Sequence, residues 1–149
     1  MLPVKLAGLG WYLPERRVTN AELEAQLGIP AEWIERVTGV RERRYATDET
    51  TVGMGAAAAR MALGMADLRV EQLDAIICAA TGVQQTIPCT AALMQRELHA
   101  PEGASACFDV NGTCLSFLFA LQTAAHLIAG GVYHNVLIVS SELVSRSLN

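Results

Sequence analysis

The chain has 149 residues, of which 52% are hydrophobic and 17% are charged, and this length fits one domain with a sizeable hydrophobic core. Its formal net charge of −4 argues against general nucleic-acid binding, which requires a basic surface. The longest apolar stretch, residues 115–129, is too short and too interrupted by polar residues to span a bilayer, so we expect no membrane partner.

The N-terminal segment lacks the charged head, apolar block and small-residue cleavage site of a signal peptide, which predicts a cytoplasmic location. Residues 4–10 (VKLAGLG) predict a first strand. Gly8 and Gly10 have the spacing that opens a dinucleotide-binding loop, but the third glycine of that motif is absent and Pro14 stands where its helix should continue. A dinucleotide site is therefore disfavoured.

Three further runs of Val, Ile and small residues predict strands. Their apolarity is continuous rather than alternating, which is typical of parallel strands covered on both faces. The runs are residues 73–81 (LDAIICAAT), 106–110 (ACFDV) and 135–141 (NVLIVSS).

Helical patterns separate these strands, the first opening at Thr50 or Thr51 and the last stopping at Gly130-Gly131. The last helix is apolar nearly all round, so we expect it to be buried. The alternation predicts an α/β fold in layers, with a mixed, mostly parallel sheet and right-handed crossovers. The predicted helices are residues 50–66, 89–99 and 113–131.

The four cysteines are expected to be reduced thiols in a cytoplasmic protein. They form no CxxC pair and no zinc-like spacing, so we expect no metal. Cys78 and Cys107 lie inside strand runs and are interpreted as core residues. Cys114 differs, because it stands where the strand 106–110 gives way to a helix.

In the first turn of a helix, Cys114 would face unpaired amides and the positive end of the helix dipole. Such a position lowers a thiol pKa from about 8.5 toward neutral and supplies donors to an oxyanion, and both effects serve acyl transfer. The alternative is an inert cysteine that packs as a small hydrophobe.

The nucleophile hypothesis lacks a base within this sequence. His126 lies twelve residues further along the same helix, about 18 Å away, which is too far to reach the thiol. His134 precedes the last strand at the opposite edge of a parallel layout, and His99 ends another helix. The chemistry of Cys114 is therefore expected to be incomplete within these residues.

Several segments, in this order, resemble β-ketoacyl-acyl carrier protein synthase III, a thiolase-like condensing enzyme. The resemblance runs from about residue 4 to residue 149 and implies that residues 1–149 are the N-terminal half of such a fold, with the C-terminal half absent. The segments are AGLGWYLPERRVTNAELE, EWIERVTGVRERRYA, ETTVGMGAAAARMAL, CFDVNGTCLSFLFAL and VLIVSSELVSR.

The resemblance implies that Cys114 is the acylated nucleophile of fatty-acid synthesis, taking its acyl group from acyl-CoA. A His and an Asn from the C-terminal half would then assist decarboxylation of malonyl-acyl carrier protein, and the carbanion would attack the acyl-enzyme. It also implies a homodimer, an acyl carrier protein partner and no separate cofactor, because the CoA thioester is a substrate.

The resemblance implies further site residues. Trp33 matches the tryptophan that stacks on the CoA adenine, and Thr38 matches a threonine at the mouth of the pantetheine tunnel. Where the family has a phosphate-binding arginine this chain has Val37, and Arg36 one place earlier is the candidate for that contact. Ile87 matches a residue that crosses the dimer interface and closes the partner's acyl pocket.

Other interpretations remain open. The cluster of Arg36, Arg41, Arg43 and Arg44 is either a solvated surface with self-paired charges or an attraction site for CoA phosphates or an acidic carrier protein. The residues CLSF also resemble enzymes that condense two long acyl chains head to head. A specialised ketosynthase and a non-catalytic fragment or interaction module are the remaining alternatives.

Overall fold

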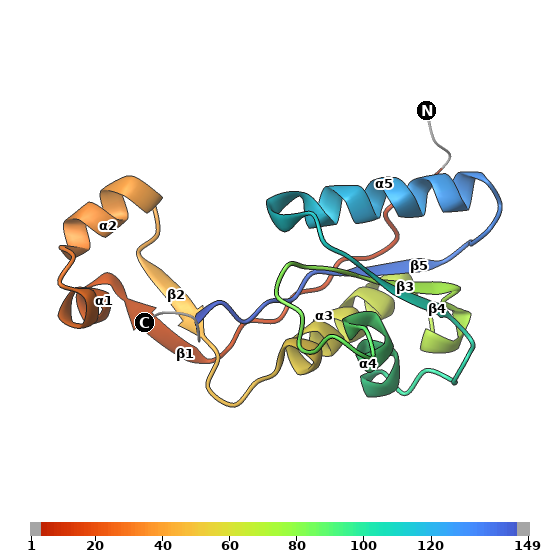
Figure 1. Cartoon of the computed structure of the whole chain (residues 1–149), viewed down its shortest axis with the longest axis horizontal. Helices are drawn as coiled ribbons and strands as arrows, with labels where there is room; N and C mark the ends of the chain where they lie inside the picture. The colour runs from red at the N-terminus through yellow and green to blue at the C-terminus, as the bar shows by residue number, and fades with distance from the viewer. Residues whose placement is uncertain (1–3, 146–149) are drawn as a thin grey trace.

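A parallel sheet of three strands in the order β4-β3-β5 is the centre of the computed structural model, which describes residues 4–145 (Figure 1). Ala75 in β3 lies opposite Ala106 in β4 and Val136 in β5. The middle strand is buried along its whole length, which is why its sequence is apolar without alternation. The strands are β3 (Ala75–Ala79), β4 (Ala106–Val110) and β5 (Val136–Val139).

Helices cover both faces of this sheet (Figure 1). The helices α3 (Thr51–Ala66) and α4 (Thr90–Glu97) pack on the face that contains Ile76 and Cys78. The helix α5 (Ser116–Ala129) packs on the other face, against Ile77 and Ala79. Successive strand residues point to opposite faces, so β3 supplies both halves of the core. The predicted layered α/β fold is confirmed.

Local signals explain where these helices begin. The Thr50 hydroxyl accepts a hydrogen bond from the Gly53 N–H and so caps α3, which is one of the two openings that the sequence predicted. Asp109 on β4 accepts from the amides of Thr90 and Ala91, at 2.8 and 2.9 Å, and so caps α4 from a neighbouring element. Short 3₁₀ turns, η1 (Val70–Gln72) and η2 (Thr113–Leu115), precede β3 and α5.

The helix α5 is covered on one side only, so the prediction of a helix buried all round is wrong for this chain. Ala120 and Ala124 are buried against the sheet. Phe117 and Leu118 on the outer side are 45% and 57% exposed, because no second layer lies over them within residues 4–145.

The segment 4–10 is not a strand, contrary to the sequence prediction. It runs along α3, where a Cβ at Gly8 would collide with the carbonyl oxygen of Ala62 and one at Gly10 with that of Ala58. The two glycines therefore serve close packing of backbone on helix, which is a structural reason for their spacing.

A small lobe that the sequence prediction missed occupies residues 16–45 (left in Figure 1). Its two strands pair antiparallel, and its core contains Val18, Leu23 and Ile34. Gly28 and Gly39 end its helices in the left-handed conformation, with φ of 68° and 69°. Its elements are β1 (Arg16–Thr19), α1 (Asn20–Leu27), α2 (Ala31–Thr38) and β2 (Glu42–Tyr45).

Within the described residues, no helix has the length and apolarity needed to cross a membrane. The same residues contain no group of three or more His, Cys, Asp or Glu side chains that could hold a metal ion.

Candidate active site

Cys114 lies in the turn that joins the carboxyl end of β4 to α5. It is the middle residue of η2, and the α-helix begins two residues later at Ser116. Thr113 has φ 52°, a left-handed conformation that a β-branched residue seldom adopts. The sharp turn ends with Cys114 exposed.

A buried hydroxyl holds this turn. Ser116 Oγ accepts a hydrogen bond from the Gly112 N–H at 3.0 Å and donates one to the Thr113 carbonyl at 2.7 Å. The Phe119 ring packs against Gly112, where a Cβ would lie 2.5 Å from a ring carbon. Ser116 and Gly112 are functional candidates that the sequence prediction missed, and the signal for both was their place directly around Cys114.

The thiol of Cys114 opens into a small cavity of about 320 Å³. Its walls come from the carboxyl ends of all three strands, where open α/β sheets bind their ligands. Within residues 4–145, the backbone N–H of Cys114 makes no hydrogen bond and remains available as a donor. The lining residues are Ala79, Thr113, Cys114, Ser116, Phe117, Ser140, Ser141 and Glu142.

Two of the other cysteines are core residues, as predicted. Cys78 is 1% exposed, and burial together with the charge of Asp109 raises its pKa to about 12. Partial burial also raises the pKa of Cys107, which packs against the hydrophobic cluster that contains Cys78. Cys89 is half-buried, with its Sγ 3.7 Å from the Cys107 carbonyl oxygen.

None of the histidines lines the Cys114 cavity. His126 Nδ1 lies 2.7 Å from the carbonyl oxygen of Gln122, one turn earlier on α5. The His134 N–H donates to Asp74, which directly precedes β3 and so marks the amino edge of the sheet. His99 follows α4 in a left-handed conformation. The predicted lack of a histidine base beside Cys114 is confirmed for the described residues.

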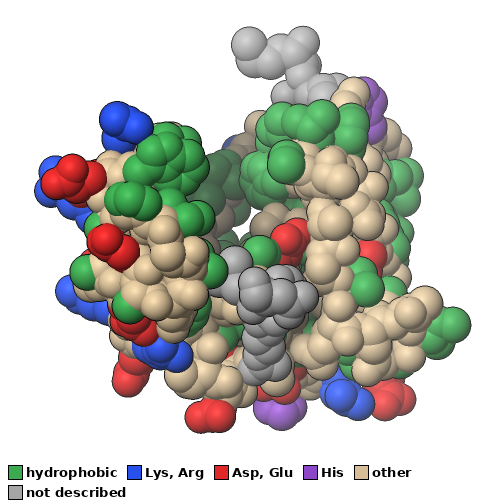
Figure 2. Space-filling model, turned by 60° about the vertical axis from the view of Figure 1, so that its left-hand side comes forward, with side chains coloured by type: hydrophobic (Ala, Val, Ile, Leu, Met, Phe, Trp, Pro, Cys, Tyr) green, Lys and Arg blue, Asp and Glu red, His purple; other side chains and the backbone are tan. Residues whose placement is uncertain are grey.

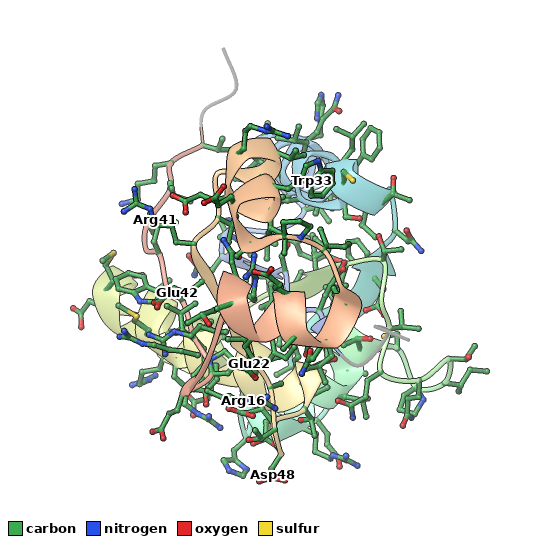
Figure 3. The ribbon with its side chains drawn as sticks, turned by 90° about the vertical axis from the view of Figure 1, so that its left-hand side faces the viewer. Arg16, Glu22, Trp33, Arg41, Glu42 and Asp48 are labelled. Carbon is green, nitrogen blue, oxygen red and sulfur yellow. The ribbon has the colours of Figure 1, made fainter. Side chains whose placement is uncertain are left out.

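The predicted CoA-binding residues lie together on the small lobe. Trp33 projects from α2 and is 45% exposed (Figure 3). Thr38 ends the same helix, and its hydroxyl donates to the Ile34 carbonyl. Arg36 is exposed and has no ion pair or hydrogen bond within the described part of the chain. None of these three lines the Cys114 cavity.

The predicted basic cluster is mostly engaged in local contacts. Arg41 pairs with Glu35 at 2.8 Å, and Arg43 donates to the Asn20 side chain. Arg44 donates to the carbonyl oxygens of residues 14 and 15. Three of its four members therefore have structural partners.

Ile87 stands apart from the other predicted site residues. It is 84% exposed, on the loop between β3 and α4.

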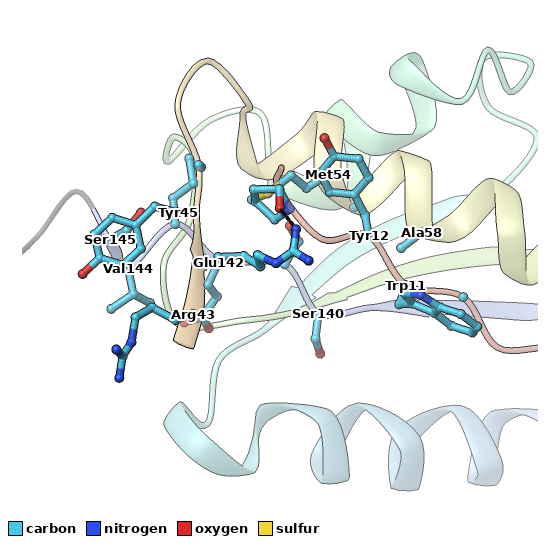
Figure 4. Close-up of a pocket in the computed structure, with 17 residues that line it drawn as sticks. Trp11, Tyr12, Arg43, Tyr45, Met54, Ala58, Ser140, Glu142, Val144 and Ser145 are labelled. Atoms are coloured by element: carbon cyan, nitrogen blue, oxygen red, sulfur yellow. Dashed lines mark hydrogen bonds between the residues drawn. The ribbon is translucent and has the colours of Figure 1, made fainter. Parts of the chain in front are cut away.

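A larger cavity of about 550 Å³ lies beside the first (Figure 4), and the sequence prediction missed it. Trp11 and Tyr12 line it from the N-terminal segment, Arg43 and Tyr45 from β2, and residues 140–145 from the segment after β5. Apolar side chains face the hollow between the small lobe and the sheet layers from both sides (Figure 2). The segment 140–142 belongs to both cavities.

Comparisons with known proteins give a consistent result. The family model for 3-oxoacyl-[acyl-carrier-protein] synthase III matches residues 108–149, which include Cys114. The β-ketoacyl-[acyl-carrier-protein] synthase III of Clostridium acetobutylicum is 37% identical over all 149 residues, which span 45% of that protein.

Solved structures share the fold. The 3-oxoacyl-[acyl-carrier-protein] synthase III of Aquifex aeolicus matches with a TM-score of 0.93 and 39% identity, covering 97% of this chain and 46% of that one. The priming β-ketosynthase of the R1128 polyketide pathway matches with a TM-score of 0.90 and 33% identity, covering 95% and 42%. The chain, which spans less than half the length of these relatives, is thus a homologue of the β-ketoacyl-acyl carrier protein synthase III enzymes with their thiolase-like α/β fold.

Proposed function

We propose that the chain is the N-terminal half of a condensing enzyme and carries its acylated nucleophile, Cys114. The observation that carries this proposal is the turn itself. An exposed thiol stands at the carboxyl edge of a parallel sheet, opens into a cavity and has a free backbone N–H beside it. These are the parts that an acyl-transfer site requires.

In the first step, the Cys114 thiolate attacks the carbonyl carbon of an acyl-CoA. A C–S bond forms, and the carbonyl oxygen becomes an oxyanion toward which the Cys114 N–H can donate. The oxyanion then collapses, the bond to the CoA sulfur breaks, and CoA leaves with the proton that the thiol gave up. The acyl group remains on Cys114 as a thioester.

In the second step, malonyl-acyl carrier protein loses carbon dioxide, and its carbanion attacks the acyl-Cys114 carbonyl. A carbon–carbon bond forms and the Cys114 thiolate is released. Stabilising the carbanion needs hydrogen-bond donors opposite the thiol, and the histidines of the described residues do not line the cavity. We assign this task to a His and an Asn from the remainder of the enzyme.

Binding of the CoA moiety is proposed for the small lobe. Trp33 offers an exposed ring for the adenine, and Arg36 offers a charge free of local partners for a phosphate. Thr38 stands at the end of the same helix. Ile87, exposed on its loop, is proposed to meet the second subunit of a homodimer.

A specialised ketosynthase is the second candidate. Its support is the 33% identity to a priming β-ketosynthase of a polyketide pathway. The products formed from a panel of acyl-CoAs with malonyl-carrier protein would separate this role from fatty-acid synthesis.

The direct test is incubation of the purified protein with an acyl-CoA, followed by peptide mapping by mass spectrometry. The acyl mass is expected on the Cys114 peptide and is expected to disappear in Cys114→Ala, while Cys89→Ala retains it. Acylation that persists in Cys114→Ala would refute the proposal.

A further inference from the structure

Two short segments join the small lobe to the sheet layers (Figure 1). Residues 10–15 lead into β1, and residues 46–50 lead from β2 to α3. The lobe has a core of its own, formed by Val18, Leu23 and Ile34, and its four elements pack chiefly on one another. The segment 140–145 faces the lobe across the larger cavity. The position of the lobe therefore depends on how the two joining segments, here named the neck, are held.

The neck continues the pairing of β1 with β2. In the antiparallel register of these strands, Arg16 lies opposite Tyr45. Tyr12 is four residues before Arg16, and Glu49 is four residues after Tyr45, so the same register places Tyr12 opposite Glu49. The Tyr12 hydroxyl donates a hydrogen bond to Glu49 Oε1 at 3.3 Å. This contact closes the neck just before the start of α3.

Both ends of the neck are anchored. Next to the lobe, the Arg44 guanidinium on β2 donates to the carbonyl oxygens of Pro14 and Glu15, at 2.9 and 3.3 Å. At the other end, Gly10 packs so closely on α3 that a Cβ there would collide with the carbonyl oxygen of Ala58. The contact between tyrosine and glutamate lies between these anchors and joins the two segments to each other.

The charge states of the two side chains favour this contact at neutral pH. Backbone hydrogen bonds, from its own amide and from the Thr47 amide at 2.7 Å, lower the pKa of Glu49. Partial burial and the charge of Glu49 raise the pKa of Tyr12. Glu49 is therefore ionised while Tyr12 keeps its proton, so the hydroxyl donates to a full negative charge.

The residues proposed to bind CoA lie on the lobe, whereas the thiol belongs to the sheet layers. Trp33, Arg36 and Thr38 are on α2, and none of them lines the Cys114 cavity. A bound acyl-CoA must therefore extend from the lobe to the thiol. The acyl carbon reaches the sulfur only when the lobe is correctly placed, because a displacement of about 1 Å can slow a reaction about a hundredfold.

We infer that Tyr12 and Glu49 are positioning residues: their contact locks the neck and so fixes the distance between the CoA-binding surface of the lobe and the Cys114 thiol. This inference rests on the proposed function for its ligand, CoA. Its consequence is selective. A thioester without the nucleotide part of CoA has nothing to bind on the lobe, so its reaction with Cys114 depends far less on the neck.

The first test measures the position of the lobe without any substrate. In a Trp11→Phe background, Trp33 is the one tryptophan and serves as the donor for energy transfer to a naphthalene-sulfonate label on the exposed Cys114 thiol. We expect Tyr12→Phe, which removes only the hydroxyl, to broaden the distribution of distances between Trp33 and the label. Tyr133→Phe, between α5 and β5, is the matched control and should keep the parent distribution. An unchanged distribution in Tyr12→Phe would overturn the inference.

The second test compares acylation of Cys114 by an acyl-CoA and by the N-acetylcysteamine thioester of the same acyl group. We expect Tyr12→Phe to lower kcat/KM for the acyl-CoA about tenfold relative to kcat/KM for the small thioester, and Tyr133→Phe to keep the parent ratio. Tyr12→Phe combined with Glu49→Ala should lower this ratio no more than the stronger single variant, because both changes remove one contact. An unchanged ratio in Tyr12→Phe, or additive losses in the double variant, would refute the positioning role.

Failure of the proposed function is distinguishable from failure of this inference. If neither thioester acylates the parent protein, the proposed function is wrong. The energy-transfer measurement still decides whether the Tyr12–Glu49 contact holds the lobe in place, because it uses no substrate.

Discussion

At the scale of single residues, the chemistry depends on what surrounds each thiol. Burial, complete for Cys78 and partial for Cys107, raises the pKa of both thiols, whereas Cys114 is exposed on its turn. A thiol that stays protonated is a poor nucleophile. The turn thus selects Cys114 through exposure.

Alkylation should reveal this difference directly. At pH 8 a thiol with a pKa of about 12 is ionised to only about one part in ten thousand, so Cys78 should not react with iodoacetamide. We expect Cys114 to be labelled first in limited labelling followed by peptide mapping. Raising the pH to about 9 should leave Cys78 unlabelled, because its pKa still lies far above. Preferential labelling of Cys78 or Cys107 would contradict the assignment.

Ser116 should contribute more to the stability of the fold than an ordinary serine on a helix surface. Ser116→Ala removes both hydrogen bonds that the Ser116 hydroxyl makes to the turn and leaves the Gly112 N–H without this acceptor. We expect a loss of about 1–2 kcal/mol in the free energy of unfolding, measured by urea denaturation, together with slower alkylation of Cys114. Thr123→Ala is the matched control, because its exposed hydroxyl donates to the Phe119 carbonyl in the preceding turn of α5 and lies away from the Cys114 turn. Equal effects of the two variants would contradict the role given to Ser116.

At the scale of elements, a carboxylate joins the segments that flank β3 and β5 at each end of the sheet. At the amino edge, Asp74 accepts from the amides of His134 and Asn135 and so ties the start of β3 to the start of β5. At the carboxyl edge, the strands end in the Cys114 turn and in the segment that holds Glu142. The carboxyl edge also contains the Cys114 cavity.

The Asp74 contact predicts a pH dependence of stability. Hydrogen bonds from the amides of Asn135 and His134 lower the pKa of this carboxyl below its ordinary value. A carboxyl with a lowered folded pKa stabilises the fold above its unfolded pKa, about 3.9, and this contribution is lost as the pH falls through the folded pKa. The difference in urea midpoint between the parent and Asp74→Ala should therefore be constant from pH 7 to about 5.5 and shrink below about pH 4.

Asp48→Ala is the control for this experiment, since Asp48 is exposed on the segment between β2 and α3 (labelled in Figure 3). If the difference in urea midpoint between the parent and Asp74→Ala stayed the same at low pH, the charge of Asp74 would contribute nothing to the stability of the fold.

At the scale of the whole molecule, the outer side of α5 presents apolar side chains that nothing covers within residues 4–145. Leu115, Phe117, Leu118 and Phe119 lie at the start of this helix and are between 45% and 57% exposed. Soluble monomers rarely expose apolar side chains in such a contiguous group. These apolar side chains lie next to Cys114, so a protein surface that covered them would also border the candidate site.

The isolated 149-residue chain is therefore expected to self-associate through this apolar surface. We also expect that it does not condense acyl groups with malonyl-carrier protein, because no histidine of the described residues lines the Cys114 cavity. Leu118→Glu should raise the concentration needed for association by about tenfold or more, because a charge at the centre of the patch opposes its burial. Light scattering after size-exclusion chromatography measures this change. Val132→Glu, at an equally exposed residue beyond the helix, should have little effect. A chain that is monomeric at high concentration would contradict the prediction.

Much of the sheet-and-helix order was predictable from local sequence. Continuous apolar runs indicated the three sheet strands, a capping threonine marked the start of α3, and the change of pattern at Cys114 indicated a strand-to-helix turn. The small lobe was missed because its elements are only four or eight residues long. Patterns that short do not show a clear period.

By itself, the sequence determined the α/β alternation, the position of Cys114 at a strand-to-helix junction and the distance of the histidines from Cys114. Only the tertiary structure decided that β3 is the middle strand, that residues 4–10 pack on α3, and that α5 is covered on one side. Only the tertiary structure shows that Glu142 lines the same cavity as Cys114, which lies 28 residues earlier in the sequence. The reason is physical. A local sequence pattern shows that a side chain prefers burial, but it does not show which other segment will bury that side chain. Cavities are likewise enclosed by segments that are distant in the sequence, and contacts between such segments leave no local pattern.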